Sequence, residues 1–286
     1  MTASARRPRV WAMIAVYAAL AVATATVLYP VLLVVKKAFE PGRQFALSAS
    51  PIPDDVTLDH VRALLGARGP DGELAFVRHA LASVVVALAT TVVGIALACT
   101  AAYALSRFRF PGRRTALTTF LVVQMFPASL LLLPLYVLLH RLGLLNSLTG
   151  LVLVYSTTAI PFCVWTLKGY FDGLPRELLE AARVDGAGPA RIFFTIVLPL
   201  ARPGIAVTAL FSFMTAWNEF IMASTFLTDE GKYTLPVLLQ SSVGQFSADW
   251  GRFAAGAIVT SVPVMILFYV LQKYLVGGLT AGAVKG

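Results

Sequence analysis

Charged side chains gather at residues 176–185, a polar stretch within the apolar second half of this chain. Glu180 and Arg183 stand three residues apart, so a helix would bring the carboxylate and the guanidinium to the same face. Glu180 could pair with Arg183 or with a basic group of another protein, and Asp185 adds a second carboxylate beside Gly186. These residue types therefore indicate charged contact chemistry.

Two short helices joined at a glycine would position these side chains. Pro175 suits the first turn of the first helix, whose apolar face is predicted to hold Leu174, Leu178, Ala181 and Ala182. Gly186 falls where that helix should end in the left-handed conformation. A second helix should begin at Pro189 and end at Pro199, with an apolar face of Ile192, Phe193, Ile196 and Val197. Such a unit could dock as a rigid knob into a partner's cleft, although an ordinary amphipathic loop also fits this periodicity.

The composition is that of a membrane protein. The chain has 286 residues, of which 58% are hydrophobic and 13% charged, whereas soluble domains carry about 25% charged residues. Its net charge of +9 comes from Lys and Arg placed between apolar spans, which does not favour a nucleic-acid partner. Cys99 and Cys163 lie inside apolar spans, so we expect packed thiols and neither a disulfide nor a metal site.

Six apolar segments are long enough to cross a bilayer, which predicts an all-α integral membrane protein with six transmembrane helices. The segment at the N-terminal end is too long for a signal peptide and has no clear cleavage site. The expected spans cover residues 12–35, 80–105, 115–139, 148–167, 204–227 and 253–276. Between and beyond them lie a tail at 1–11, loops at 36–79, 168–203 and 228–252, and a tail at 277–286, with one permease-type domain at about 79–276. A short helix from Thr57 to Gly66 is expected in the first long loop.

The distribution of Lys and Arg predicts the orientation of these spans. With the N-terminus inside, the inner segments hold more Lys and Arg than the outer ones and fewer acids. The turn from Arg107 to Arg114 alone holds four positive charges and no acid. Both termini and the 168–203 loop are therefore expected in the cytoplasm.

A spacing in the polar loop resembles a known motif. Glu180-Ala181-Ala182, three residues, Gly186, nine residues and then Ile196-x-Leu198-Pro199 resembles the EAA loop of ABC importer permeases. From the first apolar helix to the tail, the chain is similar to the MalG-type maltose permeases of the carbohydrate-uptake group. The resemblance implies the type I importer (MetI-like) fold and the import of a sugar, expected to be maltose or maltodextrin, across the bacterial inner membrane.

The resemblance also implies partners and coupling residues. We expect a second, different permease subunit, an ATPase homodimer, a periplasmic or lipid-anchored sugar-binding protein and membrane lipid, but no nucleic acid. This chain has no phosphate-binding loop motif and is not expected to be an enzyme or to hold a cofactor, so ATP and Mg²⁺ would be bound by the ATPase. The EAA loop would form the coupling helix seated on the ATPase, and the tail, with Lys285, would reach between the ATPase subunits. Taken without the resemblance, the small residues of the tail favour a disordered end. The coupling candidates are Glu180, Ala181, Ala182, Asp185, Gly186 and Lys285.

Polar residues inside the predicted spans are candidates for a substrate path. Glu219 is the single acid in a predicted span, and a bare carboxylate at mid-bilayer costs about 2.5–3.5 kcal/mol, so it should face protein or water. The candidates are Tyr155, Thr158, Trp217, Asn218 and Glu219, and both a substrate-facing and a helix-packing role remain open for them. Trp217-Asn-Glu-Phe220 resembles the wider sugar-permease family, whereas Gln124-Met-Phe-Pro127 resembles the maltose branch. Trehalose, another oligosaccharide or glycerol phosphate therefore remain alternative substrates.

The loop at 228–252 contains a polar run, Gln240 to Ser247. In the maltose permeases that this chain resembles, the corresponding loop reaches into the sugar cleft of the binding protein, and a plain linker is the alternative. The candidates in this loop are Gln240, Ser241, Gln245 and Phe246.

Two other classes of protein remain as alternatives. A secondary transporter would show internal repeats and coupling-ion ligands, but one intramembrane acid and no evident repeat count against it. An intramembrane enzyme would need a nucleophile–base or metal pair within the spans, and His60, His79 and His140 fall at span edges or in loops.

Overall fold

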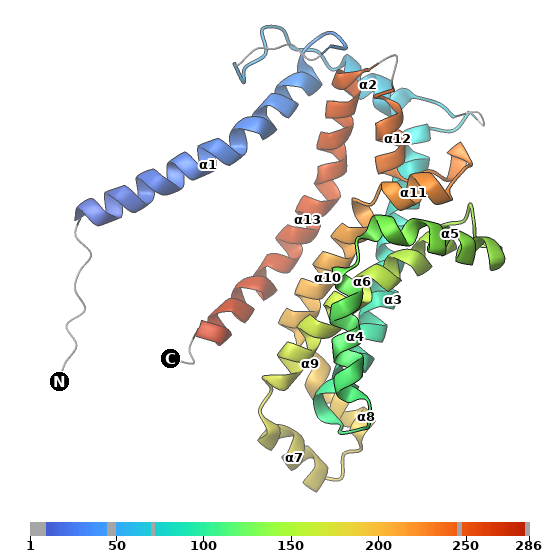
Figure 1. Ribbon diagram of the computed structural model, residues 1–286. Helices are drawn as coiled ribbons and strands as arrows, with labels where there is room; N and C mark the ends of the chain where they lie inside the picture. The colour runs from blue at the N-terminus through green and yellow to red at the C-terminus, as the bar shows by residue number, and fades with distance from the viewer. Residues whose placement is uncertain (1–9, 45–49, 70–71, 245–247, 284–286) are drawn as a thin grey trace. The chain divides into compact units, whose positions relative to one another are not determined.

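The computed structural model describes residues 10–44, 50–69, 72–244 and 248–283, of which 275–283 are described by backbone alone (Figure 1). The described residues are mainly helical and form no β-strand, only isolated bridges. The chain divides into two compact units, one made of residues 1–67 and 239–259 and the other of 68–238 and 260–286. The predicted all-α class is confirmed.

The first unit is built on α1 (Val10–Phe39), α2 (Asp59–Gly66) and the beginning of α13 (Trp250–Ala283). Its buried centre is small and alanine-rich, with Ala38, Ala254 and Ala255 in contact with partly buried apolar residues. Helix α2 ends at Gly66 as predicted, and the Thr57 hydroxyl accepts a hydrogen bond from the Asp59 N–H at 3.1 Å. Most of α1 is exposed and apolar, as a lipid-facing helix must be.

The second unit is centred on α3 (Ala75–Arg107), α6 (Leu148–Asp172) and α10 (Arg202–Trp217), which pack along one another (Figure 1). Small residues such as Ala98 and Ala102 are fully buried on α3 and let the helix axes approach closely. Within a bilayer, burial removes no apolar surface from water, so close packing and hydrogen bonds hold these helices together.

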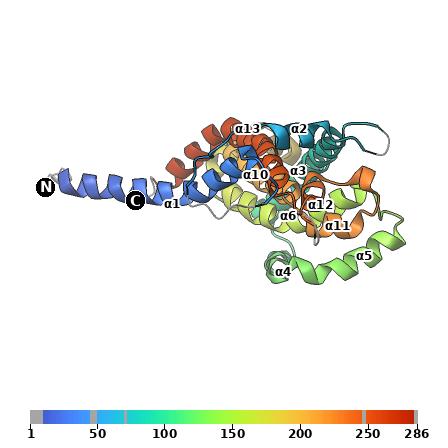
Figure 2. The same cartoon turned by 90° about the horizontal axis from the view of Figure 1, so that it is seen from above.

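The predicted third span is not one helix. It forms α4 (Arg113–Met125), the 3₁₀ turn η1 (Ala128–Leu131) and α5 (Leu132–Arg141), bent by 99° at the break. The cause is Pro127, which has no N–H to donate and forces Phe126 into an extended conformation at ψ 128°. Figure 2 shows α4 and α5 on one side of the α3–α6–α10 group.

The predicted fifth span is also broken. Helix α10 ends at Trp217, and α11 (Ile221–Phe226) begins after three residues. At its other end α10 meets the preceding helical segment, Pro189–Leu200, at 77°. The described residues thus contain four helices long and apolar enough to span a membrane, or up to six if each bent pair counts as one span.

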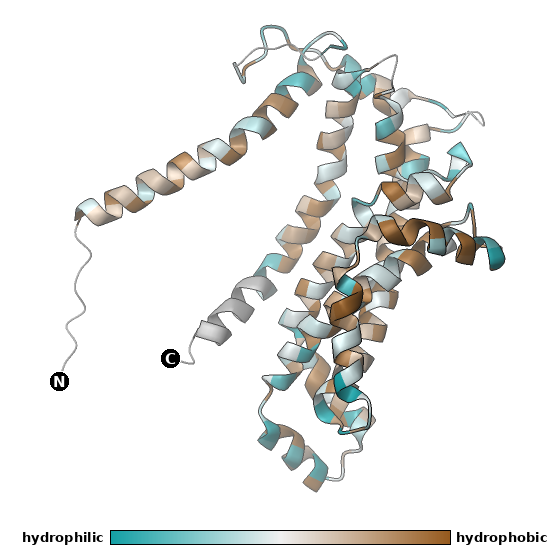
Figure 3. Ribbon diagram, viewed as in Figure 1, coloured by the Kyte–Doolittle hydropathy of each residue, from teal (hydrophilic) through white to brown (hydrophobic). Residues whose placement is uncertain are grey.

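The remaining predicted spans match helices that extend further at their ends. Helix α13 covers the predicted sixth span and continues into the predicted tail as far as Ala283. The loop after α11 contains the short η3 (Glu230–Lys232) and α12 (Leu235–Ser241). Figure 3 shows that α7 (Arg176–Val184) is largely hydrophilic, whereas α5 is mainly hydrophobic.

Candidate functional site

The EAA segment, residues 180–199, begins in α7 and turns sharply at Gly186. Gly186 has a φ of +80°, and its N–H donates to the Arg183 carbonyl at 3.0 Å. The Ala187 N–H donates to the Ala182 carbonyl at 2.9 Å. These two bonds form a Schellman motif, which satisfies carbonyls that the helix end would otherwise leave free. The predicted left-handed glycine is confirmed.

The second helix of the segment begins at Pro189, as predicted, but does not end at Pro199. It runs through α8 (Pro189–Ile192), the π-helical η2 (Phe193–Val197) and α9 (Leu198–Leu200). In the wider π turn the Leu198 N–H bonds to the Phe193 carbonyl, which gives the Pro199 ring the room that an α turn lacks. The helix therefore passes the proline and bends only at Ala201.

The buried face of α7 differs from the prediction. Leu179 is only 4% exposed, and Ala182 packs against the same core cluster. Leu178, Ala181 and Val184, three residues apart in turn, form instead an exposed apolar stripe, with Val184 89% exposed. The sequence predicted that Leu178, Ala181 and Ala182 share one apolar face, but periodicity does not fix which way a face points, and Leu178 and Ala181 point outward.

The core beneath the EAA segment connects it to α3 and α6. The Tyr103 ring of α3 lies 4.8 Å from the Phe193 ring and 6.4 Å from the Phe171 ring of α6. The Tyr103 hydroxyl donates to the Pro189 carbonyl at 3.4 Å. A displacement of the segment would therefore be transmitted directly to two long helices.

A second link runs through Arg107 at the end of α3. Its Nη2 donates to the Leu174 carbonyl at 3.2 Å and to the Phe171 carbonyl. These carbonyls lie at the end of α6 and just before α7, so one guanidinium joins three helices. In the sequence Arg107 is one of four positive charges in a turn, and no spacing marks it as a link between helices.

The predicted coupling residues lie largely on the surface of this segment. Glu180, Ala181, Asp185 and Gly186 are exposed, and Ala182 is half-buried. Glu180 and Arg183, predicted as a possible pair, line the same cavity. Lys285 lies outside the described residues.

The structure joins two predicted substrate-path residues, Tyr155 and Glu219. Tyr155 is 1% exposed on α6, and its hydroxyl donates to Glu219 Oε2 at 2.7 Å. Glu219 Oε2 also accepts from the Ala223 N–H at 3.0 Å, and Oε1 accepts from the Met222 N–H at 2.8 Å. The carboxylate thus occupies the start of α11, where free N–H groups and the helix dipole favour a negative charge. This arrangement accounts for an acid within an apolar region.

The other substrate-path candidates, which lie near the break between α10 and α11, differ in exposure. The Trp217 indole is buried, stacks on Phe213 at 5.4 Å and donates from Nε1 to the Thr260 carbonyl at 3.1 Å. The Thr158 hydroxyl donates to the Tyr155 carbonyl of its own helix at 2.9 Å, whereas Asn218 is exposed.

The candidate loop for the binding protein is only partly described. Gln240 and Ser241 are exposed at the end of α12, and Gln245 and Phe246 lie outside the described residues. A bridge pairs Val243 with Ala248 across the gap between them. Over the described residues, no group of three or more His, Cys, Asp or Glu side chains could hold a metal ion.

Comparison with known proteins agrees with this architecture. Residues 91–280 match the family model described as binding-protein-dependent transport system inner membrane component. The galactooligosaccharide transport permease GanQ of Bacillus subtilis is 40% identical over 94% of each chain. The maltodextrin transport permease MdxG of the same organism is 37% identical over 96% of each. The maltose/maltodextrin permease MalG of Vibrio vulnificus is 39% identical over 97% of this chain and 96% of its own.

Solved structures share the fold. A chain of a bacterial ABC transporter that imports the acidic polysaccharide alginate matches with a TM-score of 0.75 at 22% identity, over 96% of this chain and 99% of that one. A chain of the MetNI methionine transporter matches with a TM-score of 0.59 at 18% identity, over 70% of this chain and 94% of that one. The predicted MetI-like permease fold is thereby confirmed.

Proposed function

Because this chain belongs to the family of binding-protein-dependent transport system inner membrane components, we propose that it is a permease subunit of an ATP-driven sugar importer. The support comes from relatives that cover nearly the whole chain and are themselves named as permeases for galactooligosaccharides, maltodextrin and maltose. The trehalose permease SugB of Mycobacterium tuberculosis is 36% identical over 85% of this chain. An oligosaccharide of hexoses is the shared substrate class, and maltose or maltodextrin is the specific substrate that we propose.

The single observation that carries the coupling role is the packing of the EAA segment against α3 and α6 through Tyr103. Tyr103 of α3 bonds to the segment at Pro189, and Arg107 of α3 joins the end of α6 to Leu174 just before α7, while Leu178, Ala181 and Val184 stay exposed. In the proposal this apolar stripe sits in a cleft of an ATPase subunit, with Glu180 and Asp185 available to basic groups of that partner. ATP and Mg²⁺ bind to the ATPase dimer. Closure of that dimer moves α7, and the contacts of Tyr103 and Arg107 transmit the movement to the membrane helices.

The proposed assembly follows from this role. The chain pairs with a second, different permease, two ATPase subunits and a sugar-binding protein, in the bacterial inner membrane with both termini and the EAA segment in the cytoplasm. On the opposite side, the loop with Gln240, Ser241, Gln245 and Phe246 meets the binding protein.

The tail with Lys285 reaches the ATPase, and removal of residues 278–286 should then reduce the stimulation of ATP hydrolysis.

The sugar path in this proposal passes the break between α10 and α11. Glu219 and Tyr155 hold the break in shape through their mutual hydrogen bond, and buried Trp217 supports it from α10. Exposed Asn218 is then the polar side chain free to meet a sugar hydroxyl, with Thr158 one helical turn beyond Tyr155.

Uptake into reconstituted vesicles tests the proposal. The chain would be purified with its partner subunits and supplied with labelled maltose, maltotriose, trehalose or a galactooligosaccharide. Accumulation of the labelled sugar should require both ATP, supplied on the side of the ATPase subunits, and the soluble binding protein. Uptake driven by a proton or sodium gradient alone would contradict the proposal, whereas ATP-dependent uptake of trehalose but not maltose would correct only the substrate.

A further inference from the structure

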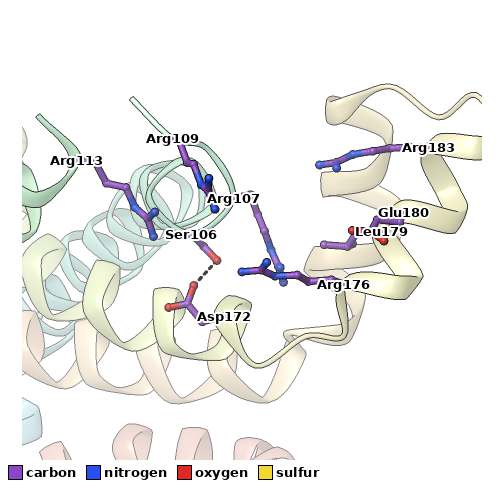
Figure 4. Close-up of a pocket in the computed structure, with 9 residues that line it drawn as sticks. All are labelled: Ser106, Arg107, Arg109, Arg113, Asp172, Arg176, Leu179, Glu180 and Arg183. Carbon is purple, nitrogen blue, oxygen red and sulfur yellow. Dashed lines mark hydrogen bonds between the residues drawn. The ribbon is translucent and has the colours of Figure 1, made fainter. Parts of the chain in front are cut away.

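A strongly basic cavity of about 390 Å³ lies between the end of α3, the turn into α4 and helix α7 (Figure 4). Five guanidinium groups and two carboxylates line it, which leaves an excess of three positive charges. We call it the arginine pocket, and its basic residues are Arg107, Arg109, Arg113, Arg176 and Arg183.

The two acids of the pocket offset the arginines only in part, with Asp172 and Arg107 within electrostatic reach of each other. Asp172 Oδ1 accepts from the Ser106 hydroxyl at 2.6 Å, and Oδ2 forms an ion pair with Lys168 at 2.5 Å. Each oxygen of this carboxylate is therefore already bonded, and one of them to a cation outside the pocket. Glu180 is exposed on α7, where water screens its charge.

The arginines converge from separate elements. Figure 4 shows Arg107 and Arg176 pointing into the same space, with Arg183 directed toward it from α7. Arg107 also lies within electrostatic reach of Arg176 and Arg183. The Nε atoms of Arg107 and Arg113 are buried without a hydrogen-bond partner among the described residues. A bound anion would reduce the repulsion between these arginines and accept hydrogen bonds from their unpaired Nε–H groups.

The donor set selects the kind of anion. Guanidinium groups present paired N–H donors that match the oxygens of phosphate, and several around one space favour a group with more than one negative oxygen. The volume exceeds that of a bare phosphate ion and falls within the range of about 300–1,000 Å³ found for small-molecule sites. Arg107 is the last residue of α3, Arg109 lies in the turn that follows, and Arg113 is the first residue of α4. Ends of membrane helices are where lipid headgroups lie.

We propose that the arginine pocket binds a phosphate group carried by a larger molecule. Its source is either the headgroup of an anionic phospholipid or a soluble phosphate ester. The bound phosphate would bridge the α3–α4 turn to α7 and thereby stiffen the attachment of the EAA segment. Binding requires neither a sugar nor an ATPase, so it stands apart from the proposed transport function.

The test uses the full chain, purified in neutral detergent and freed of lipid. In one arm the chain is offered phosphatidylglycerol against phosphatidylcholine, and native mass spectrometry counts the retained lipids. In the other arm equilibrium dialysis measures the binding of labelled glycerol 3-phosphate, with inorganic phosphate as competitor. The pocket variant is Arg109→Gln with Arg176→Gln. The matched control is Arg114→Gln with Arg191→Gln, which removes two neighbouring positive charges that do not line the pocket.

Binding in at least one arm should weaken by about tenfold or more in the pocket variant, because each lost charge-assisted bond contributes strongly, and should change little in the control. Loss confined to the lipid arm identifies a headgroup, and loss confined to the ester arm identifies a soluble ligand. Absence of binding in both arms, or equal weakening in the two variants, would overturn the proposal. If the double variant fails to fold, Arg176→Gln against Arg191→Gln makes the same comparison with one charge.

Discussion

At the scale of single residues, Glu219 shows how an acid is kept in an apolar region. Its carboxylate accepts three hydrogen bonds, two from N–H groups at the start of α11 and one from the Tyr155 hydroxyl. Since three donors replace the water that an exposed carboxylate would bind, the desolvation cost is largely offset. The same bonds give the acid a structural task, which is to hold the break after α10.

Replacing Tyr155 by Phe should therefore lower the stability of the chain without altering sugar recognition. Loss of one bond to a carboxylate should cost about 1 kcal/mol in a membrane protein. Thermal unfolding in detergent measures this, with Thr157→Val as control, since the Thr157 hydroxyl bonds only to its own helix at Val154. A raised KM for sugar at unchanged stability would instead place Tyr155 on the substrate path.

Gly186 sets a second residue-scale requirement, which concerns the backbone alone. A Cβ at this position would meet nothing within 4 Å, but the φ of +80° disfavours an L residue by about 1–2 kcal/mol. Asn tolerates this conformation better than a β-branched residue does. We expect Gly186→Val to reach the membrane normally and lose uptake, and Gly186→Asn to retain much of it. Wild-type uptake by the Val variant would argue against a rigid turn.

At the scale of elements, the sequence predicted helices well and breaks poorly. Long apolar runs identified α1, α3, α6 and α13 because length and hydropathy alone distinguish a span. The break at Pro127 carried a local signal, the proline itself, but a proline inside a span can kink a helix as easily as end it. Pro161 remains inside α6, so residue type alone could not have separated the two cases.

The break at Asn218–Phe220 and the arginine pocket had no local signal. The first depends on Glu219 meeting Tyr155, which lies 64 residues earlier in the chain. The pocket depends on α3, α4 and α7 coming together. Such arrangements follow from tertiary packing, which periodicity within one segment does not encode. The Gly186 turn was predictable because its cause is confined to one residue.

Two glycines test how closely α6 and α10 must pack. A Cβ at Gly204 would lie 2.5 Å from the Tyr170 ring, whereas a Cβ at Gly169 would meet nothing within 4 Å. Gly204→Ala should therefore destabilise the chain by about 1–3 kcal/mol through overpacking. Gly169→Ala, at an open helical position, should be neutral or stabilise it by up to about 1 kcal/mol. Thermal unfolding of both variants gives the comparison, and equal effects would mean that the ring moves freely.

At the scale of the whole molecule, the proposed function requires that the EAA segment and the first long loop lie on opposite sides of the membrane. The positive-inside bias predicts this arrangement. A direct measurement is feasible because the two native cysteines, Cys99 and Cys163, are both buried. A thiol added at an exposed position should then give the main labelling signal.

Val184→Cys and Val56→Cys provide the matched pair. Val184 is 89% exposed on α7, and Val56 is 72% exposed in the loop before α2. In membranes made without the ATPase partner, a membrane-impermeant maleimide should label the Val184 variant in inside-out vesicles but not in intact spheroplasts, and the Val56 variant in the reverse pattern. The unmodified chain measures labelling of the native thiols. If the Val184 variant were labelled only from outside, an ATPase in the cytoplasm could not reach the EAA segment, and the coupling mechanism would fail whatever sugar is carried.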